Sequence, residues 1–206
     1  MTDNNGIEKN TAEKTKKPSW VLSALEFVEM LVLVILFALL IYNFAFRICN
    51  VNGSSMNTTL YNGQRIITTN LFYTPKQDDI VVFHQTGDLN EPLVKRIIAT
   101  EGQSVKIDFS KKNKMTIWVD GELYYDAYGY YDQARATVYP QHNFDYSTQI
   151  FEATVPDGHV FVLGDNRGNS KDSRTVGTIK EDSIIGKVLF RFYSGEKNAL
   201  VFEIVD

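Results

Sequence analysis

The sequence predicts a mainly β domain that follows one N-terminal membrane-spanning helix. Two observations lead to this fold class. Residues 20–46 form a long apolar stretch, in which Asn43 is the only strongly polar side chain after Met30. From Val51 onward, short runs of β-forming residues are separated by turn residues, and none of them has a helical period. The 206 residues leave room for one domain of ordinary size beyond the first fifty.

The apolar stretch is long enough to be an uncleaved membrane anchor. As a helix it would measure roughly 40 Å, which crosses a hydrocarbon layer of about 30 Å with some tilt. The alternative is a cleaved signal peptide, but residues 44–47 read Phe-Ala-Phe-Arg and offer no small-x-small cleavage site. We therefore expect a polar cytoplasmic tail at residues 1–19, an anchor at 20–46 and an extracytoplasmic domain at 47–206.

Charge asymmetry around the anchor predicts its orientation. Lys9, Lys14, Lys16 and Lys17 precede it, whereas only Arg47 follows it closely. The positive-inside rule then places the N-terminus in the cytoplasm. The expected location is a single-pass protein of the bacterial cell membrane.

The predicted strands occupy most of the outer domain. A two-residue turn of the primed type fits Asp120-Gly121, which lies between two apolar runs and indicates a hairpin. The tyrosine-rich stretch from Tyr125 to Gln149 loses the alternation, so we expect an insertion around residues 108–155. The segments that read as strands, including the two strands of this hairpin, are 65–70, 79–84, 93–100, 104–109, 115–119, 122–125, 159–163, 184–192 and 199–205.

Composition argues against several functions. The net charge is −4 and the cations are scattered, so nucleic acid is not an expected partner. Cys49 is the single cysteine, which excludes an internal disulfide. There is no Cys/His cluster with the spacing of a zinc site, and we expect neither a metal nor another cofactor.

Ser55 is the candidate nucleophile. It lies among small residues, where Gly53 permits close approach of the backbone to a ligand. A serine hydroxyl must lose its proton to a base before it attacks efficiently. The candidate base is Lys95, in the aliphatic run 93–98. Its pKa would have to fall by roughly 2 to 3 units, which burial in apolar surroundings can achieve.

Strand alternation separates Lys95 from Arg96. In a strand Lys95 shares a face with Leu93 and Ile97, and Arg96 points the opposite way. We therefore expect one of the two cations to face the core. The alternative is an edge strand with two surface cations.

The polar run 164–174 follows an apolar strand. Its Asp, Asn, Ser and Arg residues can build an internally hydrogen-bonded loop that orients a side chain from another strand.

Together these segments resemble the ordered motifs of the bacterial type I signal peptidases. The resemblance extends from the membrane helix to about residue 186, and its last motif is the most specific. The segments that carry it are Ser55-Met56 with Thr59-Leu60, residues 79–83, residues 94–97, and residues 164–167 with Ser170 and 172–174. It implies a peptidase with a Ser/Lys pair that removes signal peptides from exported preproteins, with small residues one and three positions before the cut. Membrane lipid would surround the anchor.

The resemblance also implies a role for each matching residue. Ser55 would be the nucleophile and Lys95 the general base, and the Ser55 backbone N–H would contribute to the oxyanion hole. Some family members add a serine two residues before the nucleophile, where this chain has Gly53. Ser170 would hydrogen-bond the lysine. Asp172 and Arg174 would form an ion pair, and the loop would be shaped by Asp165, Asn166 and Arg167.

Two departures and two alternatives accompany this interpretation. Thr58 stands where the family usually has proline, and residues 99–102 replace a Gly-x-Pro-Gly run. One alternative is a non-enzymatic assembly factor for surface polymers such as pili. The other is a Ser/His mechanism, for which the chain offers His84, His142 and His159.

Overall fold

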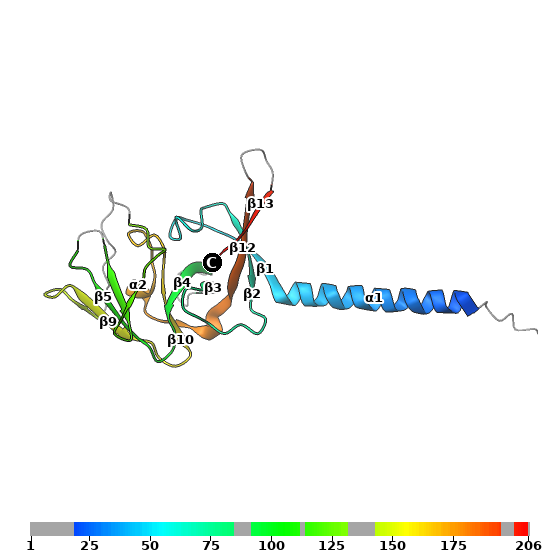
Figure 1. Cartoon of the computed structure of the whole chain (residues 1–206), viewed down its shortest axis with the longest axis horizontal. Coiled ribbons are helices and arrows are strands. Elements are labelled where there is room, and N and C mark those ends of the chain that lie inside the picture. The colour runs from blue at the N-terminus through cyan, green and yellow to red at the C-terminus, as the bar shows by residue number, and fades with distance from the viewer. Residues whose placement is uncertain (1–18, 85–91, 112–113, 132–142, 195–199, 206) are drawn as a thin grey trace, which may run out of the picture. The chain divides into compact units, whose positions relative to one another are not determined.

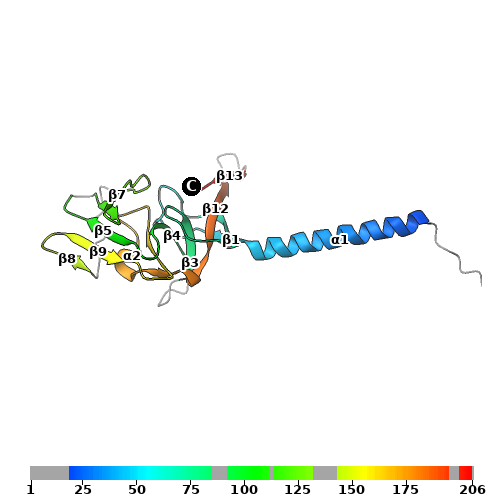
Figure 2. The ribbon, with the colours of Figure 1, turned by 60° about the horizontal axis from the view of Figure 1, so that its bottom comes forward.

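The structure is a computed structural model that describes residues 19–84, 92–111, 114–131, 143–194 and 200–205. It divides into two compact units, residues 1–42 and 43–206. The first contains most of the long helix, and the second contains the β-sheets (Figures 1 and 2).

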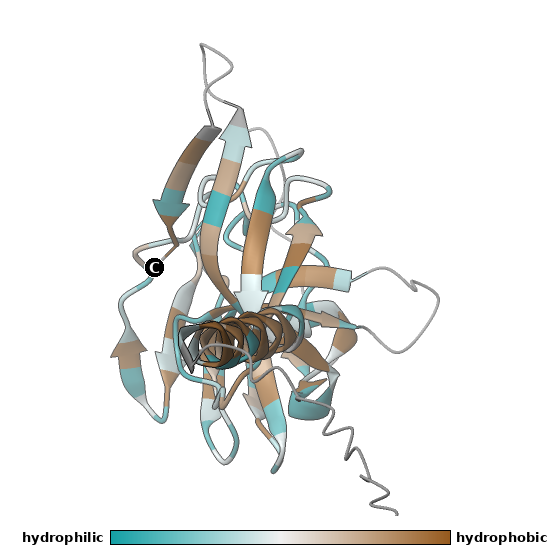
Figure 3. Cartoon of the chain, turned by 90° about the vertical axis from the view of Figure 1, so that its right-hand side faces the viewer, coloured by the Kyte–Doolittle hydropathy of each residue, from teal (hydrophilic) through white to brown (hydrophobic). Residues whose placement is uncertain are grey.

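Helix α1 (Ser19–Ala45) carries two charged side chains, Glu26 and Glu29, and is otherwise mostly apolar, as its predominantly hydrophobic colouring in Figure 3 indicates. Its stretch Trp20–Asn43 has a mean hydropathy of 2.7, and none of this stretch is buried by other parts of the described protein. A helix that is predominantly apolar and uncovered is suited to lipid. The predicted helix is therefore confirmed, although it ends at Ala45 and Phe46 already belongs to the first strand.

The strands form two antiparallel sheets, which confirms the mainly β class. The larger sheet has the order β1 (Phe46–Asn50), β2 (Arg65–Thr69), β12 (Ile184–Ser194), β3 (Ile80–His84), β4 (Pro92–Ala99), β10 (His159–Leu163) and β11 (Ile179–Lys180), with β13 (Leu200–Ile204) paired to β12. The smaller sheet has the order β7 (Glu122–Tyr124), β6 (Thr116–Val119), β5 (Ser104–Asp108), β9 (Ile150–Thr154) and β8 (Phe144–Asp145). Two short helices, α2 (Ser173–Val176) and η1 (Glu181–Ser183), lie near β11 in sequence.

Apolar side chains from both sheets form one core cluster between them. Ile98 and Phe161 come from β4 and β10, whereas Ile107, Ile117 and Phe151 come from the smaller sheet. Burial of these side chains removes apolar surface from water, at about 25 cal/mol for each Å². The smaller sheet is therefore fixed against the larger one at β4 and β10.

Strand β4 lies inside the larger sheet. It pairs with β3 on one side and with β10 on the other. Both of its faces are also covered, and Lys95 and Arg96 are 2% and 0% exposed. The expectation that one of these cations would face the core was too narrow, because both are buried, and the edge-strand alternative was wrong. Sequence alternation cannot show that a second layer covers the other face.

The Asp120-Gly121 hairpin is confirmed. Asp120 and Gly121 have φ angles of 53° and 79°, as a primed two-residue turn requires. The insertion contains more strand than expected: β8 and β9 lie there, and β1 and β11 were also not predicted. β8 and β11 are two residues long, too short for alternation to reveal.

Candidate active site

The loop between β1 and β2 presents Ser55. Gly53 has a φ of 90°, which favours glycine, and its N–H donates to Asn62 Oδ1 at 2.8 Å. Beyond the serine, Met56 and Leu60 are 2% and 0% exposed and belong to the core cluster beneath the loop. The Leu60 N–H donates to the Met56 carbonyl at 2.8 Å. Ser55 is therefore held between the turn at Gly53 and the buried side chains of Met56 and Leu60.

Ser55 and Lys95 come together from segments forty residues apart. Lys95 Nζ donates hydrogen bonds of 2.8 Å to Ser55 Oγ and to the carbonyl oxygen of Val94. Once the ammonium has lost a proton, the same contact allows the amine to accept the serine proton. The geometry is that of a nucleophile and its base.

The surroundings of Lys95 favour the neutral amine. Burial lowers the pKa of Lys95 from 10.5 to about 8, and this effect outweighs the carboxylates of Asp172 and Asp165, which raise the pKa. Arg174 contributes a further lowering. With a pKa of about 8, roughly one tenth of the lysine is neutral at pH 7. A free lysine would be almost fully protonated there.

Asp172 and Arg174 form the predicted ion pair, and both are buried. Arg174 Nε and Nη2 donate to the two carboxylate oxygens at 2.8 and 2.7 Å. Burial by itself would raise the pKa of Asp172, but the Arg174 guanidinium and its hydrogen bonds hold that pKa below the ordinary value. The same carboxylate accepts the Gly164 N–H at 3.0 Å, so the pair fixes both ends of the loop.

Asp165 joins the loop to two other segments. Its carboxylate accepts two bonds of 3.0 Å from Arg96 Nε and Nη2, and one of 2.5 Å from the Thr59 hydroxyl. Arg96 lies next to Lys95 in β4, and Thr59 lies in the loop between β1 and β2 that carries Ser55, here called the nucleophile loop. A bidentate charged pair of this kind is strong and directional.

Asn166 also holds the nucleophile loop. Its backbone N–H donates to the Ser55 carbonyl at 3.0 Å, and its side-chain amide donates to the Ser54 carbonyl at 3.1 Å. The Asn169 amide donates to the Ser54 hydroxyl at 2.7 Å. The backbone hydrogen bonds among the described residues include none that the Ser55 N–H donates.

Arg167 pairs with a residue that sequence reasoning did not select. Its Nη2 donates to Asp126 Oδ1 at 2.7 Å, and Arg167 is fully buried. Asp126 belongs to the insertion, and its neighbour Tyr130 exchanges backbone bonds with Asp165 and Arg167. The insertion thus supports the loop from outside. No local pattern around Asp126 indicates this, since its partner lies 41 residues away.

Ser170 lies near the Ser55–Lys95 pair (the dyad), but the hydrogen bonds of Lys95 are made to other groups. A Cβ built on Gly164 would lie 2.2 Å from Ser170 Oγ and 2.6 Å from the Ser55 carbonyl oxygen. Only glycine fits between them. The two hydrogen bonds of Lys95 Nζ go to Ser55 and Val94, so the predicted Lys95–Ser170 hydrogen bond is not among the contacts of this structure.

Neither of the described histidines forms a hydrogen bond with Ser55, whose hydroxyl bonds to Lys95. His84 is exposed at the end of β3, and His159 Nδ1 lies 2.9 Å from the Asp157 carbonyl. His142 lies outside the described residues. Within the described ranges there is also no cluster of three or more His, Cys, Asp or Glu side chains that could hold a metal ion.

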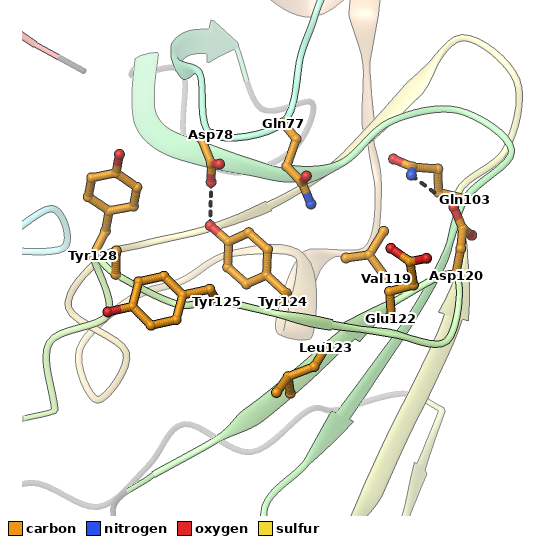
Figure 4. Close-up of a pocket in the computed structure, with 11 residues that line it drawn as sticks. Gln77, Asp78, Gln103, Val119, Asp120, Glu122, Leu123, Tyr124, Tyr125 and Tyr128 are labelled. Carbon is orange, nitrogen blue, oxygen red and sulfur yellow. Dashed lines mark hydrogen bonds between the residues drawn. The ribbon is translucent and has the colours of Figure 1, made fainter.

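Two cavities differ in their relation to the dyad. A small cavity of about 30 Å³ adjoins Ser55 and Lys95 and is walled by residues 50–53, Met56 and 92–94. A larger one of about 650 Å³ lies between the turn at Gln77 and Asp78 and the β6–β7 hairpin, and neither dyad residue lines it (Figure 4). Size alone would select the cavity that neither Ser55 nor Lys95 lines.

The chain matches known proteins over most of its length. Residues 24–193 match the family described as "Signal peptidase, peptidase S26". Signal peptidase I T of Bacillus subtilis is 34% identical over 192 residues, covering 90% of this chain and 94% of that protein. A probable signal peptidase I-1 of Synechocystis sp. is 32% identical over 182 residues and covers 84% of each chain. A signal peptidase I structure from Enterococcus faecalis aligns with a TM-score of 0.40 and 28% identity, covering 56% of this chain and 97% of that chain.

A mainly β domain behind one apolar helix, with a serine against a buried lysine, is the arrangement of a membrane-anchored serine peptidase. The chain belongs to the signal peptidase family, peptidase S26. As a member of that family it removes signal peptides from exported preproteins.

Proposed function

We propose that Ser55 and Lys95 perform this cleavage by acyl transfer. The contact of 2.8 Å between Lys95 Nζ and Ser55 Oγ, in which the lysine is only 2% exposed, is the observation that carries the proposal. Lys95 takes the hydroxyl proton while Ser55 Oγ attacks the scissile carbonyl. A positioned general base of this kind contributes about 10²- to 10⁴-fold.

The later steps move the proton that Lys95 has taken from the serine. The Ser55 N–H stabilises the oxyanion of the tetrahedral intermediate, with no serine hydroxyl added at Gly53. As the carbon–nitrogen bond breaks, Lys95 returns its proton to the leaving amine. A water molecule next attacks the acyl-enzyme and gives a proton to Lys95. Lys95 passes this proton to the departing Ser55 Oγ, which restores the serine hydroxyl and the neutral amine and releases the new carboxyl group, which ionises in solvent.

The substrate is proposed to bind as an extended strand beside β4. Residues 92–95 of β4 pair with β3, whereas pairing with β10 begins only at Arg96. Within the described ranges no strand pairs with the other backbone edge of residues 92–95, and this edge is proposed to form main-chain hydrogen bonds with the substrate. The adjoining cavity of about 30 Å³ has the volume of a single water molecule or methyl group. This supports a preference for small residues one and three positions before the cut.

The proposed orientation places the β domain outside the cytoplasm. It is supported by the four lysines before the apolar helix and by Arg47 alone immediately after it. Preproteins are cut on that side of the membrane, so orientation and function agree. The proposed divisions are a tail at residues 1–19, an anchor in membrane lipid at 20–46 and the peptidase domain at 47–206.

The test is cleavage of a preprotein that carries Ala-x-Ala before its cut site, with the full chain in detergent. We expect cleavage by the parent, and a loss of at least about 100-fold in Ser55→Ala and in Lys95→Ala. Lys106→Ala is the matched control, because that lysine is 47% exposed on the smaller sheet. Full cleavage by both dyad variants would refute the assignment. Binding of a surface subunit without cleavage by the parent would favour an assembly role instead.

A further inference from the structure

The guanidinium of Arg96 is enclosed by groups from three different segments. Two of its nitrogens bond to the Asp165 carboxylate, and Nη1 donates to the Asp78 carbonyl oxygen at 2.7 Å. The ring of Tyr128 covers it, with Arg96 Cζ 3.5 Å from the ring centroid. Cations favour the faces of aromatic rings, and the contact strengthens when water is excluded. Arg96 is 0% exposed, so water is excluded here.

Arg96 connects the two halves of the proposed dyad. It follows Lys95 directly in β4, and the Asp165 carboxylate that it binds also accepts the Thr59 hydroxyl from the nucleophile loop. A change in the orientation of the Arg96 side chain would therefore alter the charge behind the lysine and the support of the serine loop together.

Tyr128 is held in place by the segment around it. Asp126 forms an ion pair of 2.7 Å with Arg167. On the other side of Tyr128, the Tyr130 N–H donates to the Asp165 carbonyl at 2.7 Å, and the Tyr130 carbonyl accepts the Arg167 N–H at 2.9 Å. The segment is thus fastened to the same loop that supplies the carboxylate for Arg96. Figure 4 shows Tyr128 at one end of the larger cavity, near Asp78.

We propose that Tyr128 is a positioning residue for the Ser55–Lys95 pair, which it serves by keeping the Arg96 guanidinium against Asp165. This inference rests on the proposed function. The insertion then contributes to catalysis through a side chain that touches neither the substrate nor the dyad.

The consequence for Lys95 follows from the charges that face it. The carboxylates of Asp172 and Asp165 raise its pKa, whereas burial and Arg174 lower it. Without the Tyr128 ring, water from the cavity of about 650 Å³ can reach the Arg96 guanidinium and weaken its hold on Asp165. The Asp165 charge then acts more strongly on Lys95, which raises the pKa of the base. A higher pKa lowers the fraction of Lys95 that is neutral at pH 7, and far less so at pH 10.

The experiment compares Tyr128→Leu, which removes the ring, with Tyr128→Phe, which keeps it. Tyr125→Leu is the matched control, because Tyr125 is 86% exposed in the same segment. We measure kcat and KM for signal-peptide cleavage by the full chain in detergent from pH 6 to pH 10. For Tyr128→Leu we expect kcat to fall by about 10-fold at pH 7 with KM within about 2-fold, and most of the loss to vanish near pH 10. Tyr128→Phe and Tyr125→Leu are expected within about 2-fold of the parent throughout.

Two results would overturn the inference. One is a pH profile of Tyr128→Leu that coincides with that of the parent. The other is a loss of the same size at every pH together with a lower melting temperature, since a general loosening of the fold would produce it. The proposed function is tested separately: if Ser55→Ala cleaves normally, the dyad assignment fails, whereas inactive dyad variants beside an unaffected Tyr128→Leu would refute only the role of Tyr128.

Discussion

Replacing the buried Lys95 should make the protein more stable near neutral pH, and this effect should fade as the pH rises. The perturbation is Lys95→Met, which removes the charge and keeps an unbranched side chain of similar length. Lys95 is 2% exposed, and burial lowers its pKa from 10.5 to about 8. The folded protein therefore binds fewer protons at this site than the unfolded chain.

The sign and size of the effect follow from this difference. Below pH 8 both states carry the proton, and the folded state bears the full cost of a buried ammonium. Each unit by which the folded pKa lies below the unfolded pKa costs about 1.36 kcal/mol, so the fall from 10.5 to about 8 costs about 3 kcal/mol at pH 7. At pH 10 the folded lysine is neutral and the unfolded lysine is partly so, which leaves about 1 kcal/mol. The contribution of Lys95 to stability thus rises with pH between about 8 and 10.5.

Two hydrogen bonds lost from Lys95 offset part of the gain. They go to Ser55 Oγ and the Val94 carbonyl, and each contributes about 1 kcal/mol. We therefore expect Lys95→Met to exceed the parent in free energy of unfolding by about 1 kcal/mol at pH 7. The difference between the two proteins should decrease by about 2 kcal/mol from pH 7 to pH 10. This decrease does not depend on the hydrogen-bond contribution.

Urea unfolding of the full chain in detergent, followed by tryptophan fluorescence at pH 7 and pH 10, measures the difference. Lys106→Met serves as the control, because this lysine lies on the surface with 47% exposure. A difference between Lys95→Met and the parent that is the same at both pH values would refute the reasoning. It would mean that Lys95 does not bear the cost of burial from which its role as a base is inferred.

The remaining predictions concern Lys95, the buried ion pair of Asp172 and the closely packed Gly164. Cleavage by the parent at subsaturating substrate should increase about 10-fold from pH 7 to pH 9 and then level off, because the pKa of Lys95 is about 8; a rise that begins only near 10.5 would contradict this. Asp172→Asn leaves its arginine partner buried without a counter-charge, and we expect a loss of about 3 to 5 kcal/mol in urea unfolding; a loss below about 1 kcal/mol would argue against an essential pair. Gly164→Ala places a Cβ 2.2 Å from Ser170 Oγ, so cleavage should fall by at least about 10-fold. Gly121→Ala is its control: its φ of 79° strains the hairpin by about 1 kcal/mol, but its Cβ meets open space and the cleavage rate should not change.

Local chemistry in the sequence was sufficient for much of the fold. The apolar stretch predicted α1, and alternation of apolar and polar residues predicted most of the longer strands. The Asp120-Gly121 turn was predicted because positive φ angles at two successive residues select these residue types. Such features depend on neighbours along the chain, so they can be read without the tertiary structure.

The sequence by itself also determined the candidate chemistry: a serine in a small-residue loop and a lysine in an aliphatic run. Tertiary structure alone decided that these two side chains meet at 2.8 Å. It also decided that Arg96 is buried as well as Lys95 and that the Tyr128 ring covers the Arg96 guanidinium. The ion pair between Asp126 and Arg167 is a further product of the tertiary structure. The physical reason is that burial and pairing depend on which segments cover one another. Residues 40, 41 and 69 positions apart carry no mutual signal in a single sequence, although the fold brings them into hydrogen-bonding contact.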